Sequence, residues 1–164
     1  SSSAMPCGPS CSFDFTKPVD DNATFAGIIG AWSGALASGN AIDASAPTTS
    51  VNAAADNVTF ADFNPTETTA WVISVAVYVD DATTPGATSG TDPTFTLNID
   101  GERLTGLDHS IFVCSGASTG AATGARTQAS NSTIDAISVG ILFGLVTATV
   151  AAGVGSPMLL TGVG

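Results

Sequence analysis

The residues with the clearest potential for chemistry are three cysteines and the single histidine. Cys7 and Cys11 stand close together near the amino end, whereas Cys114 is far along the chain. An odd number of cysteines does not close a disulfide framework, so Cys7 could bond Cys11, or either could bond Cys114. The thiols together with His109 also supply enough ligands for a tetrahedral zinc site. A disulfide near the amino end or buried free thiols are the states we expect.

Acidic and amide side chains gather where predicted strands end. Hard oxygen ligands at such positions are typical of calcium sites in extracellular β domains, although none of these segments matches the twelve-residue calcium loop. Calcium is therefore the one cofactor that the sequence suggests, and we expect no other. The candidate ligands are Asp80, Asp81, Asn98, Asp100 and Glu102.

Catalytic residue types occur side by side in Asp108-His109-Ser110. Neighbouring residues of a strand or turn point apart, so these three cannot form a nucleophile–base–orienter arrangement. The sequence also contains no G-x-S-x-G elbow, phosphate-binding P-loop or dinucleotide-binding glycine fingerprint. We therefore expect that the protein is not an enzyme.

A carbohydrate site would need exposed aromatic rings, and the candidates are Trp32, Trp71 and Tyr78. Trp71 falls on the more apolar face of a predicted strand and is expected in the core. Tyr78 falls on the opposite, mixed face of the same strand and is expected to be exposed. This pattern keeps a sugar-binding function open.

The balance of charge excludes two classes of partner. The 164-residue chain has 14 acidic residues against Lys17, Arg103 and Arg126, a net charge of −11. Three scattered cations cannot neutralise a nucleic-acid backbone or hold an anionic membrane surface. Charged residues make up only 10% of the chain, against about 25% in a typical domain. Small polar and apolar residues must cover the surface, which favours packing against copies of the chain or a role outside the cell.

Residues 69–80 form the clearest element of the sequence. β-Branched and aromatic residues alternate there with period two, which predicts a central strand. The more apolar face is expected to be the core, so Val75→Asp is expected to prevent folding. The two predicted faces are Trp71, Ile73, Val75, Val77 and Val79 on one side, and Val72, Ser74, Ala76, Tyr78 and Asp80 on the other.

Further strands are predicted around this one. Residues 57–63, 94–99 and 110–114 read as strands, with Phe95, Leu97 and Ile99 on one face. Asp100-Gly101 is a strong hairpin signal and predicts a tight turn before a return strand at 102–104. Shorter strands are predicted at 13–16 and within 157–164. Residues 25–36 have apolar side chains at helical spacing interrupted by glycines, and we favour a glycine-kinked strand over a helix there.

The second long apolar run covers residues 134–150. Ile137, Val139, Ile141 and Phe143 share one face, and the apolar phase slips after Gly144, which predicts a bulge or bend. Residues 136–154 are uncharged and long enough for a rival membrane helix. The segment has no flanking Lys or Arg and no interfacial Trp or Tyr, so a buried strand pair is favoured and membrane association is not expected.

Three segments read as irregular. Residues 1–12 predict a flexible amino-terminal arm ahead of a single domain at 13–164. Residues 39–57 read as a loop. Residues 115–132 are low-complexity and small, which predicts either a long exposed loop or a mobile segment that only a partner orders.

Eight or nine short strands separated by Ala/Gly/Ser/Thr loops predict an all-β fold, an antiparallel sandwich or jelly-roll-like single domain. The functional expectation is a structural, self-associating homo-oligomer: a capsid, capsid-decorating (cement) or other virion subunit, or an extracellular filament subunit. Its partners would be copies of itself and a parent capsid or filament lattice, at a virion surface or outside the cell. The alternative is a secreted lectin or adhesin-type carbohydrate-binding domain, with or without calcium.

Overall fold

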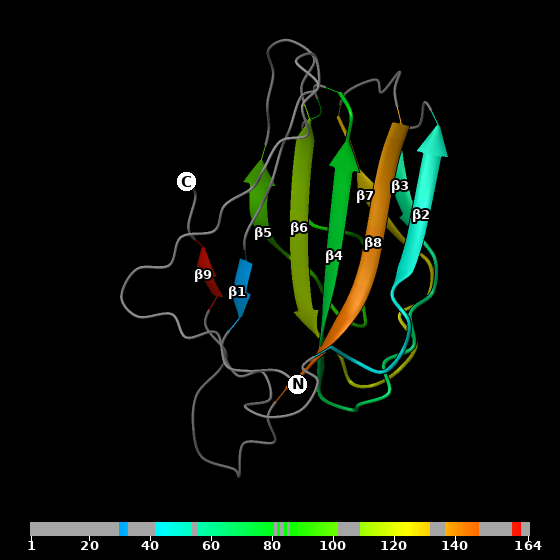
Figure 1. Ribbon diagram of the computed structural model, residues 1–164, viewed down its shortest axis with the longest axis vertical. Helices are drawn as coiled ribbons and strands as arrows, with labels where there is room; N and C mark the ends of the chain where they lie inside the picture. Colours follow the sequence, from blue (N-terminus) through cyan, green and yellow to red (C-terminus); the bar gives the residue numbers. More distant parts are fainter. Residues whose placement is uncertain are drawn as a thin grey trace, which may run out of the picture.

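A computed structural model describes residues 30–32, 42–53, 56–80, 82, 84, 86–101, 109–131, 137–147 and 159–161 (Figure 1). Within these ranges the chain forms nine strands and no helix, and all strand pairs are antiparallel, so the all-β class is confirmed. The strands are β1 (Gly30–Trp32), β2 (Thr48–Ala53), β3 (Asn57–Phe60), β4 (Ala70–Tyr78), β5 (Thr96–Gly101), β6 (Ser110–Ala117), β7 (Arg126–Ala129), β8 (Ile137–Val146) and β9 (Leu159–Thr161).

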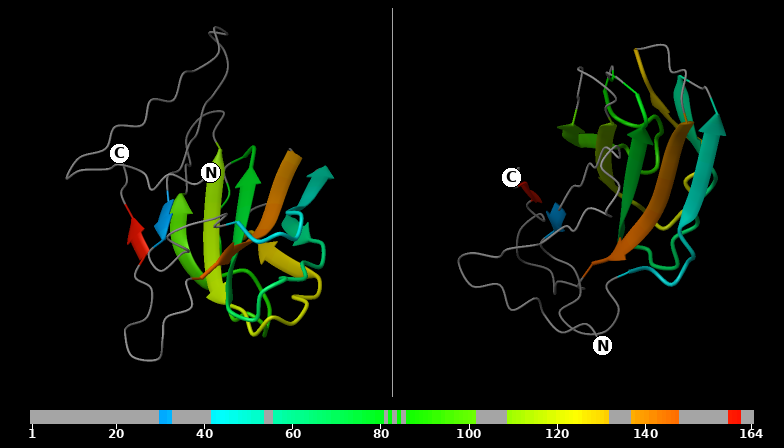
Figure 2. Two further views of the ribbon diagram at one scale, coloured as in Figure 1. Left: turned by 60° about the horizontal axis from the view of Figure 1, so that its bottom comes forward. Right: turned by 45° about the horizontal axis from the view of Figure 1, so that its top comes forward.

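Five strands form the main sheet, in the order β2-β8-β4-β6-β5. The pair β3–β7 lies across one face of this sheet, behind it in Figure 1, and β1–β9 forms a separate pair near β5. The turned views show the five strands as a twisted, curved sheet, as right-handed strand twist requires (Figure 2). We call the face toward β3–β7 the inner face and the opposite one the outer face.

The central strand is confirmed, and both of its faces contribute to hydrophobic clusters, so only the exposure expected for its mixed face is wrong. β4 lies in the middle of the sheet and pairs along its length with β6 and β8. Val72, Ala76 and Tyr78, expected on the exposed side, are at most 1% exposed on the inner face. Val75, expected in the core, is only half-buried on the outer face. The reason is that β3–β7 packs against the mixed face, while on the more apolar face Ile73 is buried and Val75 and Val77 are half-buried.

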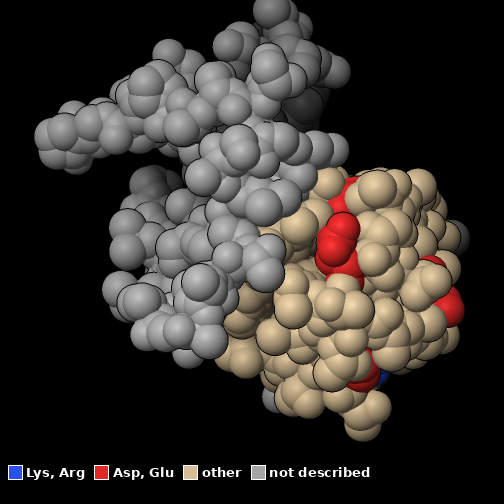
Figure 3. Space-filling model, turned by 90° about the horizontal axis from the view of Figure 1, so that it is seen from below, with Lys and Arg blue, Asp and Glu red and all other residues tan. Residues whose placement is uncertain are grey.

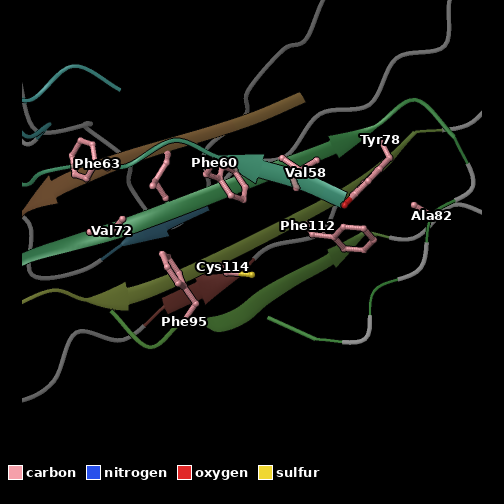
Figure 4. Close-up of a cluster of buried hydrophobic side chains, with 11 residues drawn as sticks. Val58, Phe60, Phe63, Val72, Tyr78, Ala82, Phe95, Phe112 and Cys114 are labelled. Atoms are coloured by element: carbon pink, nitrogen blue, oxygen red, sulfur yellow. The ribbon is translucent and has the colours of Figure 1, made fainter. Parts of the chain in front are cut away.

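The inner core fills the space between the main sheet and the β3–β7 pair (Figure 4). Rings and branched side chains dominate it, and Tyr78 meets Phe112 edge-on at 5.7 Å between ring centroids. The buried members are Val58, Phe60, Phe63, Val72, Ala76, Tyr78, Ala82, Phe95, Phe112, Cys114 and Leu142.

β8 is one continuous strand, so the predicted break at Gly144 and the rival membrane helix are both wrong over residues 137–146. The register with β4 runs unbroken from Ser138 to Val146. A Cβ on Gly144 would lie 2.9 Å from the Cβ of Asp43, and one on Gly140 would lie 2.4 Å from Val58 Cγ1. These glycines therefore give the second layer room to approach the sheet, rather than bending the strand.

The predicted hairpin turn at Asp100-Gly101 is also wrong. Both residues lie inside β5, opposite Phe112 and Ile111 of β6. The register shifts between Leu97 and Ile99, which marks a bulge. As a result Leu97 packs on the inner core and Ile99 on the outer face, although their spacing predicted a shared face.

Two strands lie where loops were predicted. β2 lies within residues 39–57, and residues 115–132 contain the end of β6 and all of β7. Gln128 of β7 is fully buried: its Oε1 accepts from Thr88 Oγ1 at 2.9 Å, and its Nε2 donates to Thr84 Oγ1 at 2.6 Å. Residues 115–131 are therefore held by hydrogen bonds and strand pairing within the chain.

The remaining predictions fall partly or wholly outside the described residues. β1 and β9 confirm strands within 25–36 and 157–164, and β3 confirms the one begun at residue 57. The arm at 1–12, the short strand at 13–16 and the return strand at 102–104 lie outside the described ranges.

Candidate functional site

The outer face of the main sheet is the most distinctive surface of the described structure. The strand registers place alternate residues of neighbouring strands on this face, and they are almost all apolar. None of these strand positions carries Asp, Glu, Lys or Arg. The positions are Thr49, Val51, Trp71, Ile73, Val75, Val77, Ile99, Ile111, Val113, Ser115, Ala117, Ile137, Val139, Ile141, Phe143 and Leu145.

Exposure changes from one side of this face to the other. Over β4 and β6, Ile73 and Val113 are buried, with Val75 and Phe143 packed against them. Over β2 and β8, Val51 is 71% exposed. The apolar side chains on the β2 side are therefore the ones available to a partner.

We call the exposed apolar side chains on this side the β2–β8 patch: Val51, Val79, Ile137 and Ile141. They form one contiguous surface. Val139 of β8 lies opposite Val51 of β2, and Ile137 and Ile141 lie two residues to either side of it. The Val79 amide donates to the Ile137 carbonyl at 3.1 Å, which joins the end of β4 to the same surface. Ile137 and Val79 are 51% and 42% exposed.

The described surface carries little charge elsewhere too. Seen from below, it is mostly uncharged, with acidic groups at separate places (Figure 3). Three cations in the whole chain and small polar side chains account for this. A partner that binds this surface would therefore make mainly apolar and uncharged contacts.

The calcium candidates are not brought together by the described structure. Asn98 accepts a hydrogen bond from the Ser115 hydroxyl at 2.6 Å, and Asp100 is an exposed residue of β5. Asp80 follows β4, while Asp81 and Glu102 lie outside the described residues. Among the residues that are described, no group of three His, Cys, Asp or Glu side chains could hold a metal ion.

Ser110, the serine beside the histidine, has a structural environment. Its hydroxyl is buried, donates to the Asp80 carbonyl at 3.1 Å and accepts from the Ala82 amide at 3.0 Å. It thereby fastens the end of β4 to the start of β6. His109 is half-buried next to it, and Asp108 lies outside the described ranges.

Cys114 is a free, fully buried thiol on the inner face of β6. Its Sγ accepts from the Thr88 amide at 3.4 Å and donates to Gln128 Oε1 at 3.5 Å. The thiol is part of the polar cluster around Gln128, which agrees with the expectation of a buried free thiol at this position. Cys7 and Cys11 lie outside the described residues.

The exposure expected for Tyr78 is wrong. The ring is fully buried, and its hydroxyl donates to the Gln128 carbonyl at 2.9 Å. Desolvation raises the pKa of Tyr78 to about 12. Trp71 is half-buried on the outer face, and the side chain of Trp32 is not described. The described aromatic rings therefore form no exposed platform for a sugar.

Asp43 is a buried carboxylate that the sequence analysis missed. It accepts hydrogen bonds from the Ser45 amide at 2.8 Å and from the Thr66 hydroxyl at 2.9 Å, with the Thr66 amide also donating. Burial alone would raise the pKa of Asp43, but these hydrogen bonds outweigh it and lower that pKa. Asp43-Ala-Ser45 is a recognisable Asx-turn signal, yet nothing in the sequence marks its burial.

Arg126 is the second buried charge that the sequence analysis missed. It is 5% exposed, and its guanidinium donates to the Asp92 carbonyl. The Asp92 side chain accepts from the hydroxyl and the amide of Thr119, and these hydrogen bonds, helped by the charge of Arg126, lower the pKa of Asp92. The group ties β7 to the segment before β5 and to the one after β6, so its role is structural.

No known family model, curated protein or solved structure matches this chain. Across the described residues, no helix is long and apolar enough to cross a membrane.

Proposed function

We propose that this protein is a non-enzymatic structural subunit that associates with copies of itself. The class we favour is a virion subunit, either of the capsid or decorating it, or a subunit of an extracellular assembly. The observation that carries the proposal is the charge-free apolar outer face, with the β2–β8 patch exposed at one side. Such a contiguous apolar surface on a chain of net charge −11 favours burial against a partner of the same kind.

The charged and polar side chains that make several hydrogen bonds within the fold support a structural rather than a catalytic role. Asp43 and Asp92 both accept several hydrogen bonds from neighbouring backbone and hydroxyl groups. Gln128 and Ser110 are likewise engaged within the fold. These groups hold loops to strands within the fold.

The proposal includes a jelly-roll-like sandwich as the complete fold. Its support is the β3–β7 pair, which covers the inner face of the main sheet. In the sequence β3 directly follows β2 and β7 directly precedes β8, so the chain passes from one layer to the other twice there. Two antiparallel layers around one core are the minimal arrangement of that class.

The size of the patch predicts how strongly the subunits associate. Four aliphatic side chains cover much less than the roughly 800 Å² per partner of a standard stable interface. A single contact should therefore be weak and concentration-dependent. An assembly in which each subunit makes several such contacts would be stable, because later contacts form at a high effective concentration.

The test is the mass in solution across a range of protein concentrations, for the wild type, Ile141→Lys and Ile141→Thr. Ile141 is 38% exposed, so both variants should fold. We expect the wild type to form oligomers as its concentration rises, Ile141→Thr to do so more weakly and Ile141→Lys to remain monomeric. A wild type that stays monomeric at every concentration would overturn self-association. If that monomer gains thermal stability with calcium or a glycan, the secreted binding domain becomes the better proposal.

A further inference from the structure

The two edges of the main sheet differ in how they are protected. β5 forms one edge and has two features that discourage pairing with another chain: the bulge between Leu97 and Ile99, and the exposed charge of Asp100. β2 forms the other edge and has neither. Its six residues, Thr48–Ala53, contain no charge and no proline, and their register with β8 is unbroken.

We infer that β2 pairs edge to edge, antiparallel, with β2 of a second copy of this chain. This inference rests on the self-association proposed above and names the strand through which it occurs. In the main sheet β2 is hydrogen-bonded on one side only, to β8, and in Figure 1 it lies at the rim. A regular, uncharged edge strand is a template for a further strand. In a two-fold symmetric pair the same edge of both copies is used, so β2 of one copy would pair with β2 of the other.

The side chains around β2 favour a second copy over a foreign strand. Val51 lies on the outer face and is the most exposed large apolar residue of the described structure. Residues paired across a two-fold axis lie on the same face, so Val51 of each copy would lie beside the other's β2. The two β2–β8 patches would then join into one apolar surface across the new pair.

Charge does not oppose this arrangement, despite the net charge of −11. The acidic residue that follows β2 is the exposed Asp56. Antiparallel pairing places the two copies of Asp56 at opposite ends of the paired strands, separated by at least the length of a six-residue strand. That length is about 20 Å, well beyond the Debye length of about 8 Å at physiological salt.

The experiment combines mass measurement with amide hydrogen exchange. The variants are Val51→Lys, Val51→Thr as the matched uncharged control, and Thr96→Lys as the matched charge on the other edge. Val51 and Thr96 are both exposed, so all three should fold. We expect Val51→Lys to weaken association about tenfold or more, because the two lysines would face each other across the pair. Thr96→Lys should associate like the wild type, and Val51→Thr should lose only part of the affinity.

Hydrogen exchange in the wild type supplies the readout that is specific to the edge. We expect additional protection of alternate β2 amides, those that point away from β8, as concentration drives association. If the wild type associates but these amides exchange equally at all concentrations, or if Val51→Lys associates normally, β2 pairing is overturned while the proposed function stands. A wild type that never associates overturns both. Should Val51→Lys fail to fold, exchange in the wild type still decides.

Discussion

Val77 and Tyr78 are neighbours in β4, yet they lie on faces with different surroundings. Tyr78 carries a hydroxyl and is fully buried on the inner face, where it donates a hydrogen bond to the Gln128 carbonyl. Val77 is wholly apolar and is only half-buried on the outer face. The inner face also buries Ser74 and Ser138, whereas the outer face exposes Ile137.

On β8, side-chain size separates the two faces more than polarity does. The inner face of β8 includes the small residues Gly140 and Gly144, and the second layer packs into the space that their missing side chains leave. The outer face of the same strand presents Ile137, Val139 and Ile141, which leave no such recess. A hydroxyl is tolerated inside when it has a hydrogen-bond partner, so apolar character alone does not show which face a second layer covers.

The largest difference between the faces should appear with a buried charge. Ala76→Asp places a carboxylate in the inner core, where Ala76 is 1% exposed, and should destabilise the fold by more than about 4 kcal/mol. Val75→Asp, on the half-buried outer face, should cost only about 1–3 kcal/mol and leave a folded protein, contrary to the expectation from the sequence. Denaturant unfolding of both variants checks this. Equal losses would show that the two faces are equally covered.

A smaller difference in unfolding free energy is expected when side-chain volume is changed at two adjacent residues of β8, one on each face. Gly140→Ala introduces a Cβ that would lie 2.4 Å from Val58 Cγ1 and 2.7 Å from Phe60 Cε1, so the unfolding free energy should fall by about 1–3 kcal/mol. Ile141→Ala, one residue away on the outer face, should cost about 1 kcal/mol or less. Thermal unfolding of the pair measures both, and a neutral Gly140→Ala would contradict the close approach of β3.

The smallest expected effect is the dependence of stability on pH that comes from Asp43, at the Gly144 end of the inner face. Its pKa is lower in the fold than the ordinary value of 3.8, so its contribution is present above that value and is lost as the pH falls through the lower, folded-state pKa. Asp43→Asn should therefore lower stability at pH 7 by about 1–2 kcal/mol and flatten its fall below about pH 4. Glu67→Gln, at an exposed residue, is the control. Unchanged acid unfolding in Asp43→Asn would remove Asp43 from this role.

The sequence predicted the strands whose signal is local. β4 and β8 carry many β-branched residues in alternation, and both were expected. β2 and β7 were missed because they lack an alternation of large apolar and polar residues, and their pairing with β8 and β3 is set by distant parts of the chain. Asp100-Gly101 shows the reverse case, in which a strong local turn signal is overridden by the register with β6.

For the outer face, the sequence predicted which residues share a face but not whether that face is covered. Its residues could be named in advance, since Val75, Val77 and Val79 share a face in any extended strand. Their location outside could not, because it depends on where β3 and β7 pack. The burial of Tyr78 likewise depends on Gln128, fifty residues away, and leaves no trace in the residues around Tyr78.

The order of strands in the main sheet has a consequence for how the molecule is made. β4, β6 and β5 are close enough in the sequence to meet early, whereas β2 must wait for β8, since Thr48 pairs with Leu142. Pairings over such separations form slowly, and during synthesis β2 emerges long before its partner. Until then both of its edges are unpaired. Only after β8 arrives does β2 present a single edge, so the β2 pairing that we propose would require chains in which the sheet is already complete.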